Sequence, residues 1–170
     1  FSFYRQLFPL FAKELYGGAA AATGLLTAAN AIGGICGTLL VLLLRNYRPK
    51  GMLVLYATII YALLLFPLAI STRLWIGMLL IGGLGAMDGI SVAMRQSIVQ
   101  LTTPDQMRGR AVSLQVLAAQ TANNLGTLEV GFLTAAAGLS VTLTFGGAAA
   151  LLMTLAIWRV IPGIRHYRYP

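Results

Sequence analysis

The sequence predicts an all-α integral membrane protein, and two observations carry that prediction. Apolar residues make up 58% of the chain and charged residues only 9%, whereas about a quarter of a soluble domain is charged. Residues 15–44 and 51–72 contain no charged residue. An uncharged apolar run of about 18 residues or more is long enough to cross a bilayer as a helix. We therefore expect a bundle of membrane-spanning helices.

The first expected helix, residues 1–12, is short and aromatic and contains Arg5. At about 1.5 Å per residue it cannot cross a hydrocarbon core about 30 Å thick, so we expect the outer half of a truncated spanning helix. The chain begins with Phe1 rather than methionine, which predicts a fragment. The five full spans are expected at residues 19–44, 51–70, 74–101, 108–137 and 140–161.

The second helix is rich in glycine and alanine. Its Gly33 and Gly37 form a GxxxG pair, a spacing that lets two helices approach closely. Asn30 is expected to hydrogen-bond another helix, with a substrate contact as the alternative. The third helix has almost no polar side chains, so we expect it to be the one most exposed to lipid. Pro67 is expected to kink or end it.

The fourth helix carries the acid Asp88 inside its apolar run. A charge at membrane depth is costly, and its default interpretation is functional. Asp88, Ser91 and Arg95 share one helical face at spacing i, i+3 and i+7. Two interpretations of Asp88 remain open: Arg95 or a partner helix neutralises it, or it is a protonatable site in an aqueous cavity. We expect Arg95 to be a snorkelling or gating cation near the cytoplasmic side.

The fifth helix carries an unusual polar series that includes Gln120, Asn123, Asn124 and Thr127. Such a face cannot meet lipid without a desolvation cost for each amide. We therefore expect it to meet another helix or a water-filled cavity. The sixth helix is apolar again.

A short polar turn joins the fourth and fifth helices. Its Asp105 is expected to pair with Arg108 or Arg110 or to cap the next helix, with Thr102 or Thr103 as other caps. Such a loop can latch the cytoplasmic face through ion pairs that break when the protein changes state. This latch is a hypothesis.

Lysine and arginine collect in the turns at 45–50 and 105–110 and in the tail from residue 159. The other turns hold only Lys13 and Arg73. The positive-inside rule therefore predicts that the former turns and the C-terminus are cytoplasmic. No basic run with interleaved aromatic residues occurs in a polar segment, so the net charge of +8 does not predict nucleic-acid binding.

Sequence patterns of common enzymes are missing from the chain. There is no HExxH, GxSxG or CxxC pattern, and the one histidine, His166, lies in the tail. A histidine-ligated metal or haem site would lack its ligands. Glu129 is expected near the outer surface, too far in depth from Asp88 to form an acid pair. We expect no enzymatic activity, no metal and no cofactor.

Four segments resemble the C-terminal half of major facilitator superfamily exporters, in the branch with the enterobactin exporter and multidrug efflux proteins. They are PLFAKE, GLLTAANAIGGICGTLL, LGAMDGISVAMRQSIVQLTTPDQMRGRAVS and QTANNLG. The resemblance implies a twelve-helix bundle of which this chain holds the end of helix seven through helix twelve. Hydropathy also suggests that helices one to three and four to six form a 3+3 inverted repeat, a transporter pattern.

The resemblance further implies a proton-driven exporter in a bacterial inner membrane that alternates between inward-open and outward-open states. Its partners would be the missing N-terminal six-helix half, the lipid bilayer, protons and a small-molecule substrate such as a siderophore or drug. Arg5 and Asp88 would line the central cavity, with Gln120, Asn123 and Asn124 as secondary polar lining.

Four further residues would act in gating at the cytoplasmic side, namely Arg95, Asp105, Arg108 and Arg110. The alternative function is that of a non-transporting membrane scaffold or assembly subunit, in which polar faces only hold helices together. The presence of six more hydrophobic spans upstream would favour the transporter.

Overall fold

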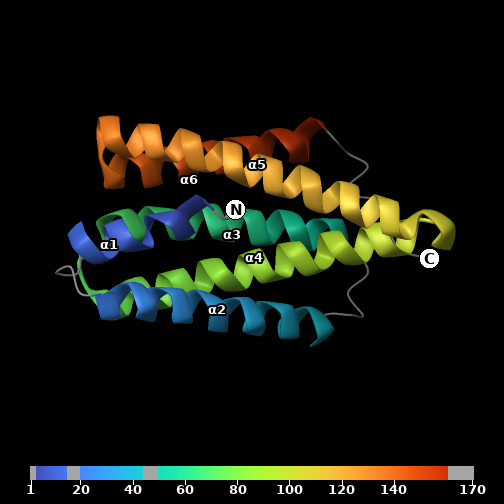
Figure 1. Cartoon of the computed structure of the whole chain (residues 1–170), viewed down its shortest axis with the longest axis horizontal. Helices are drawn as coiled ribbons and strands as arrows, with labels where there is room; N and C mark the ends of the chain where they lie inside the picture. Colours follow the sequence, from blue (N-terminus) through green and yellow to red (C-terminus); the bar gives the residue numbers. More distant parts are fainter. Residues whose placement is uncertain (1–2, 15–19, 44–49, 161–170) are drawn as a thin grey trace.

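The computed structural model describes residues 3–14, 20–43 and 50–160, and within these ranges all regular secondary structure is helical (Figure 1). The all-α prediction is therefore confirmed for the described residues. The elements are η1 (Phe3–Leu7), α1 (Phe8–Glu14), α2 (Ala20–Leu43), α3 (Lys50–Ile70), α4 (Leu74–Thr102), η2 (Asp105–Met107), α5 (Arg108–Ala137) and α6 (Leu139–Val160).

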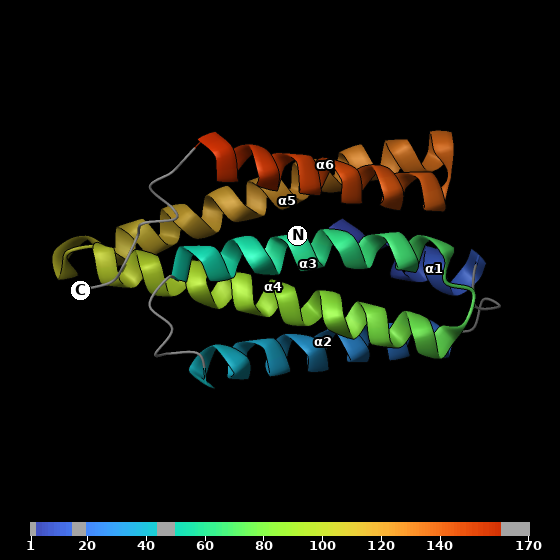
Figure 2. The same cartoon turned by 180° about the vertical axis from the view of Figure 1, so that it is seen from behind.

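The long helices lie side by side in the order α2, α4, α3 and α6 (Figures 1 and 2). The helix α5 packs on α6 at one end and runs obliquely to the far end of α4, which it meets at the η2 turn. The short elements η1 and α1 lie against α2 and α5. They continue to Glu14, two residues beyond the expected end of the first helix. This arrangement places η1 close to the middle of the bundle.

Four helices in the described residues are long and apolar enough to cross a membrane. They are α2, residues Met52–Ile70 of α3, α4 and α6. The helix α5 is as long as α4 but is not among them, since its amides and Glu129 reduce its hydropathy. Large apolar side chains on the outside, such as Phe132 at 78% exposed, suit lipid contact. These features are those of a multi-pass membrane protein.

The expectation that α3 is the helix most exposed to lipid does not fit its packing within the described residues. In the spanning segments of α3 and α4, 39% of the residues are buried, against 22% in α2 and α6. The helix α3 lies between α4 and α6 and buries Tyr61, Leu65 and Leu68 completely or nearly so. Lipid tails are as apolar as a helix interface, so hydropathy alone does not separate the two environments. Pro67 does not end α3, which continues to Ile70.

The closest helix contact joins α2 to α4 and is made by small residues. Gly33 and Gly37 lie against the backbone of Gly82 and Ala86, and a Cβ atom on either of the two α2 glycines would come within 3.0 Å of that backbone. Small residues at this spacing allow such an approach. The packing role predicted for the GxxxG pair is confirmed, and α4 supplies the matching small residues.

Candidate functional site

Asp88 lies at the centre of α4, 14 residues after Leu74 and 14 before Thr102. At about 1.5 Å per residue, each end of the helix is about 21 Å away. Only 5% of Asp88 is exposed. A carboxylate in this position loses most of its hydration, so it needs a partner of opposite charge.

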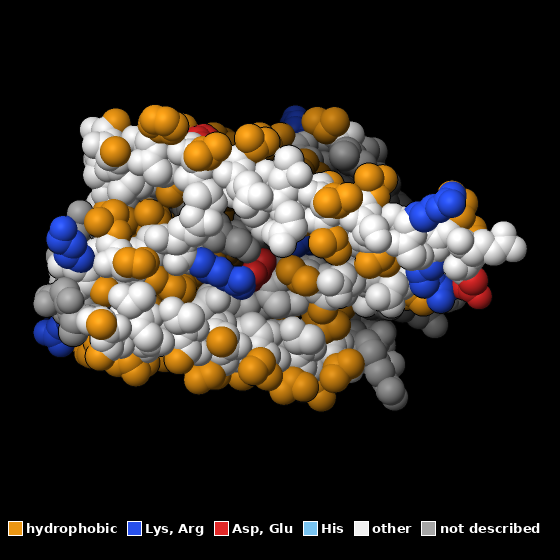
Figure 3. Space-filling model, viewed as in Figure 1, with side chains coloured by type: hydrophobic (Ala, Val, Ile, Leu, Met, Phe, Trp, Pro, Cys, Tyr) orange, Lys and Arg blue, Asp and Glu red, His pale blue; other side chains and the backbone are white. Residues whose placement is uncertain are grey.

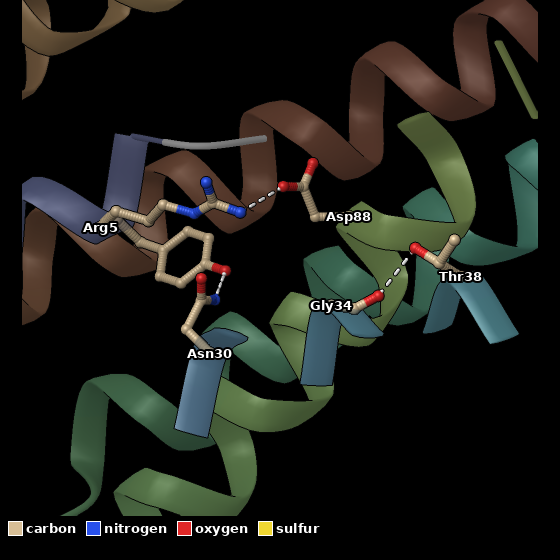
Figure 4. A network of polar contacts seen from close by, with 6 residues as sticks. Arg5, Asn30, Gly34, Thr38 and Asp88 are labelled. Atoms are coloured by element: carbon tan, nitrogen blue, oxygen red, sulfur yellow. Dashed lines mark hydrogen bonds and ion pairs between the residues drawn. The ribbon is translucent and has the colours of Figure 1, made fainter. Parts of the chain in front are cut away.

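That partner is Arg5 of η1, whose Nη2 lies 2.7 Å from Oδ2 of Asp88 (Figure 4). The Arg5 side chain is 46% exposed and the Asp88 side chain 7% exposed. The ion pair is therefore buried at its acidic end and open at its basic end. Arg95 instead donates from Nε to the backbone oxygen of Ser91, at 3.3 Å. The neutralising cation thus comes from a partner helix.

The pair borders an open groove of about 880 Å³ between η1, α2 and α4. Figure 3 shows a basic and an acidic side chain meeting beside a hollow in the middle of this face. The polar side chains that line the groove are Arg5, Thr27, Asn30, Thr38, Asp88 and Gln96. The rest of the lining is largely apolar, with Phe8, Ile35 and Leu39 among it. The groove can therefore hold a small amphipathic molecule next to a cation.

No sequence pattern points to Tyr4, which is completely buried next to Arg5. Its hydroxyl accepts a hydrogen bond from Nδ2 of Asn30 in α2 (Figure 4). The prediction that Asn30 bonds to another helix is confirmed. Gln6, also not singled out, donates to the Thr127 hydroxyl of α5 at 2.7 Å. Residues 3–7 form a 3-10 turn, so the helical spacing that points out functional faces elsewhere does not apply to them.

Ser91, one turn after Asp88, is also buried. Its hydroxyl has no hydrogen-bond partner among the described residues. A buried polar group left unsatisfied costs about 1–3 kcal/mol, and bound water commonly removes that cost.

The polar series of α5 stays away from the groove. Gln120 and Asn124 are exposed and Asn123 is partly buried, and none of the three lines the groove. No residue of α5 is buried. The structure therefore connects α5 to the Arg5 region through the Gln6–Thr127 hydrogen bond and leaves the amides on the surface of the described chain.

In the turn between α4 and α5, Asp105 pairs with Arg108. Arg108 also donates from Nε to the backbone oxygen of Gln100, at 3.1 Å, and so ties the turn to the end of α4. The capping alternatives are wrong: the residue before α5 is Met107, and no side chain caps the helix. The Thr102 hydroxyl bonds within α4 instead.

Arg110 is exposed and borders this turn. The basic residues at 44–49 and the tail at 161–170, including His166, lie outside the described residues. Within the described ranges, no three His, Cys, Asp or Glu side chains are placed to hold a metal ion.

The chain matches the family described as transmembrane secretion effector over residues 2–164. The match covers η1 and all the helices above, and so includes both members of the Arg5–Asp88 pair. No curated protein matches the chain. No solved structure matches it either.

Proposed function

Because the chain belongs to the transmembrane secretion effector family of the major facilitator superfamily, we propose that it is the C-terminal six-helix half of a proton-coupled exporter. Membership assigns it to the membrane transporters. In this proposal the complete protein has twelve helices, with a 3+3 repeat in each half. It lies in a bacterial membrane with its C-terminus in the cytoplasm, and it exports a small molecule of the siderophore or drug class.

The Arg5–Asp88 ion pair is the single observation on which the proposed proton coupling rests. It lies at mid-helix, it opens on a groove, and only its acidic end is buried. A proton on Asp88 cancels the charge that holds Arg5, so protonation breaks the ion pair and deprotonation restores it. A group of this kind changes both charge and interhelical contact with each proton, which is what a coupling site needs.

The α5 surface supports a missing second half. Its amides Gln120, Asn123 and Asn124 do not line the groove of this chain, and amides are costly in lipid. We infer that they face the N-terminal half or the cavity between the halves. Rocking of the two halves about a central site would then give alternating access.

Cells that produce the full-length protein are expected to retain less of an exported compound than cells without it, in a panel of fluorescent drugs and fluorescent iron-free siderophores. An uncoupler that collapses the proton gradient should remove the difference. Fluorescence of washed cells, with and without the uncoupler, measures it. Equal accumulation for the whole panel would favour the scaffold alternative. An upstream sequence without six further spans would favour the scaffold or a half-sized transporter that dimerises.

The turn that holds Asp105 is proposed to be a cytoplasmic latch, together with Arg95, Arg108 and Arg110. Asp105→Asn should raise the accessibility of the turn and slow export, because it removes the carboxylate that Arg108 contacts. The loss of stability should stay below about 1 kcal/mol, since the pair is at the surface. Labelling of a cysteine at Gln106 by a membrane-impermeant thiol reagent in inside-out vesicles measures accessibility.

Arg108→Gln provides the matched test, because it removes the other member of the same pair. Arg108→Gln also removes the bond to Gln100, so the double variant with Asp105→Asn should be no more accessible than Arg108→Gln alone, as expected for two residues that act as one contact. Unchanged export and labelling in Asp105→Asn would end the latch hypothesis.

A further inference from the structure

Tyr4 is held on several sides by residues from three different elements. Its ring lies edge-on to Phe8 of α1, with centroids 5.7 Å apart, and edge-on to Tyr61 of α3, with centroids 5.8 Å apart. Its hydroxyl accepts the hydrogen bond from Asn30 of α2. Edge-to-face pairs are a favoured aromatic geometry. Tyr4 is therefore the residue that holds η1 in place against α1, α2 and α3.

Asn30 is in turn fixed against α4. It is 6% exposed, and a Cβ atom on Gly85 would lie 3.0 Å from its Nδ2 and closer still to its backbone oxygen. Gly85 precedes Asp88 by three residues, which is about one helical turn. The close glycine contact between α2 and α4 thus sets the position of the Asn30 amide relative to Asp88.

Arg5 is half-exposed, and its guanidinium is held by Asp88 and by a side-chain hydrogen bond with the Tyr4 hydroxyl. Its long side chain has many rotamers. The place of its guanidinium therefore depends on the Tyr4 hydroxyl and on where η1 puts its Cα atom. Tyr4, the preceding residue of the same 3-10 turn, anchors that backbone.

We propose that Tyr4 and Asn30 are the positioning residues of the proton site: their hydrogen bond keeps the Arg5 guanidinium on Asp88. The inference rests on the proposed role of Asp88 as the coupling carboxylate. When the bond is lost, η1 moves relative to α4, Arg5 leaves the carboxylate for part of the time, and Asp88 binds its proton more readily. Tyr4 and Asn30 thus act on the Asp88 carboxylate through Arg5.

Tyr4→Phe in the purified full-length protein tests this, because it removes the hydroxyl and keeps the ring contacts. The infrared band of the protonated Asp88 carboxyl is identified by its loss in Asp88→Asn and followed against pH. In Tyr4→Phe the band should persist to higher pH than in the unmodified protein, because Arg5 then neutralises the carboxylate for less of the time. Asn30→Leu should give a similar shift, and the double variant no more than either single one.

The Arg5→Gln background separates positioning from a general structural effect. If Tyr4 acts through Arg5, adding Tyr4→Phe to Arg5→Gln should not change the midpoint of the carboxyl band any further. Thr58→Val on α3 is the matched control, because it removes a partly buried hydroxyl that bonds only its own helix, at Val54. Its midpoint should equal that of the unmodified protein.

An unchanged midpoint in Tyr4→Phe would overturn the proposal, and so would an equal shift in the Arg5→Gln background. Failure of the proposed function has a different signature. In that case Asp88→Asn would keep proton-coupled export, whatever the infrared band does in Tyr4→Phe.

Discussion

Asp88→Asn in the full-length protein is expected to abolish proton-coupled export while the bundle remains folded. Asparagine has the size of aspartate, and its oxygen can still accept the hydrogen bond that Arg5 donates at 2.7 Å. It cannot take up a proton, so the contact would no longer open and close with the proton gradient. Accumulation of the exported compound should rise to the level of cells without the protein, and no protons should enter proteoliposomes upon substrate addition.

Glu129→Gln is the matched control for this loss of charge. Glu129 is another acid within a long helix, but it is exposed on α5 and lies outside the groove. Its neutralisation should leave coupled export intact. If Asp88→Asn exports as well as the unmodified protein and still depends on the proton gradient, Asp88 is not the coupling site. Uncoupled leakage in the variant would instead support the assignment.

The candidate site was only partly predictable from sequence. Asp88 stands out because an acid within an apolar run is costly at membrane depth. Residue spacing does not pair it with Arg5, which is 83 positions away and is placed by a 3-10 turn without helical periodicity. Only the family resemblance put Arg5 and Asp88 in one cavity. Arg95 shares the face of Asp88, but two helical turns separate them, about 10 Å along the axis. Of the two neutralising partners left open by spacing, Arg95 or a partner helix, the structure has the second.

The positions of the helices along the chain were easier to predict than which helices pack against one another. The length of an apolar run sets the length of a helix. The two ends of α4, the two ends of α5, the end of α3 and the start of α6 all lie within one residue of the expected ranges. Which side of a helix is buried is not encoded in the same way, because lipid and protein interior are both apolar. The apolar helix α3 therefore gave no sign in its sequence that it lies between α4 and α6. The glycine spacing in α2 did predict a packing face, because a close contact between two helix backbones requires small residues at that spacing.

Gly33→Ala is expected to produce the largest loss of stability of any single methyl added to α2. Its Cβ atom would lie under 3.0 Å from the backbone of Gly82, and a helix backbone cannot turn aside as a flexible side chain can. The helices α2 and α4 must then separate, at a cost of about 1–3 kcal/mol in the free energy of unfolding. Thermal unfolding of the purified full-length protein, followed by circular dichroism, should show a lower Tm.

Gly24→Ala is the control on the same helix, because nothing lies within 4 Å of a Cβ atom at that position. It should leave Tm unchanged or raise it, since alanine is favoured over glycine inside a helix by about 0.5–1 kcal/mol. Asn30 lies one turn before Gly33, so separation of α2 from α4 also draws the Asn30 amide away from Tyr4. Gly33→Ala should therefore shift the pH response of the Arg5–Asp88 pair as Tyr4→Phe does. Equal Tm values for the two alanine variants would show that α2 and α4 do not approach as closely as the structure has them.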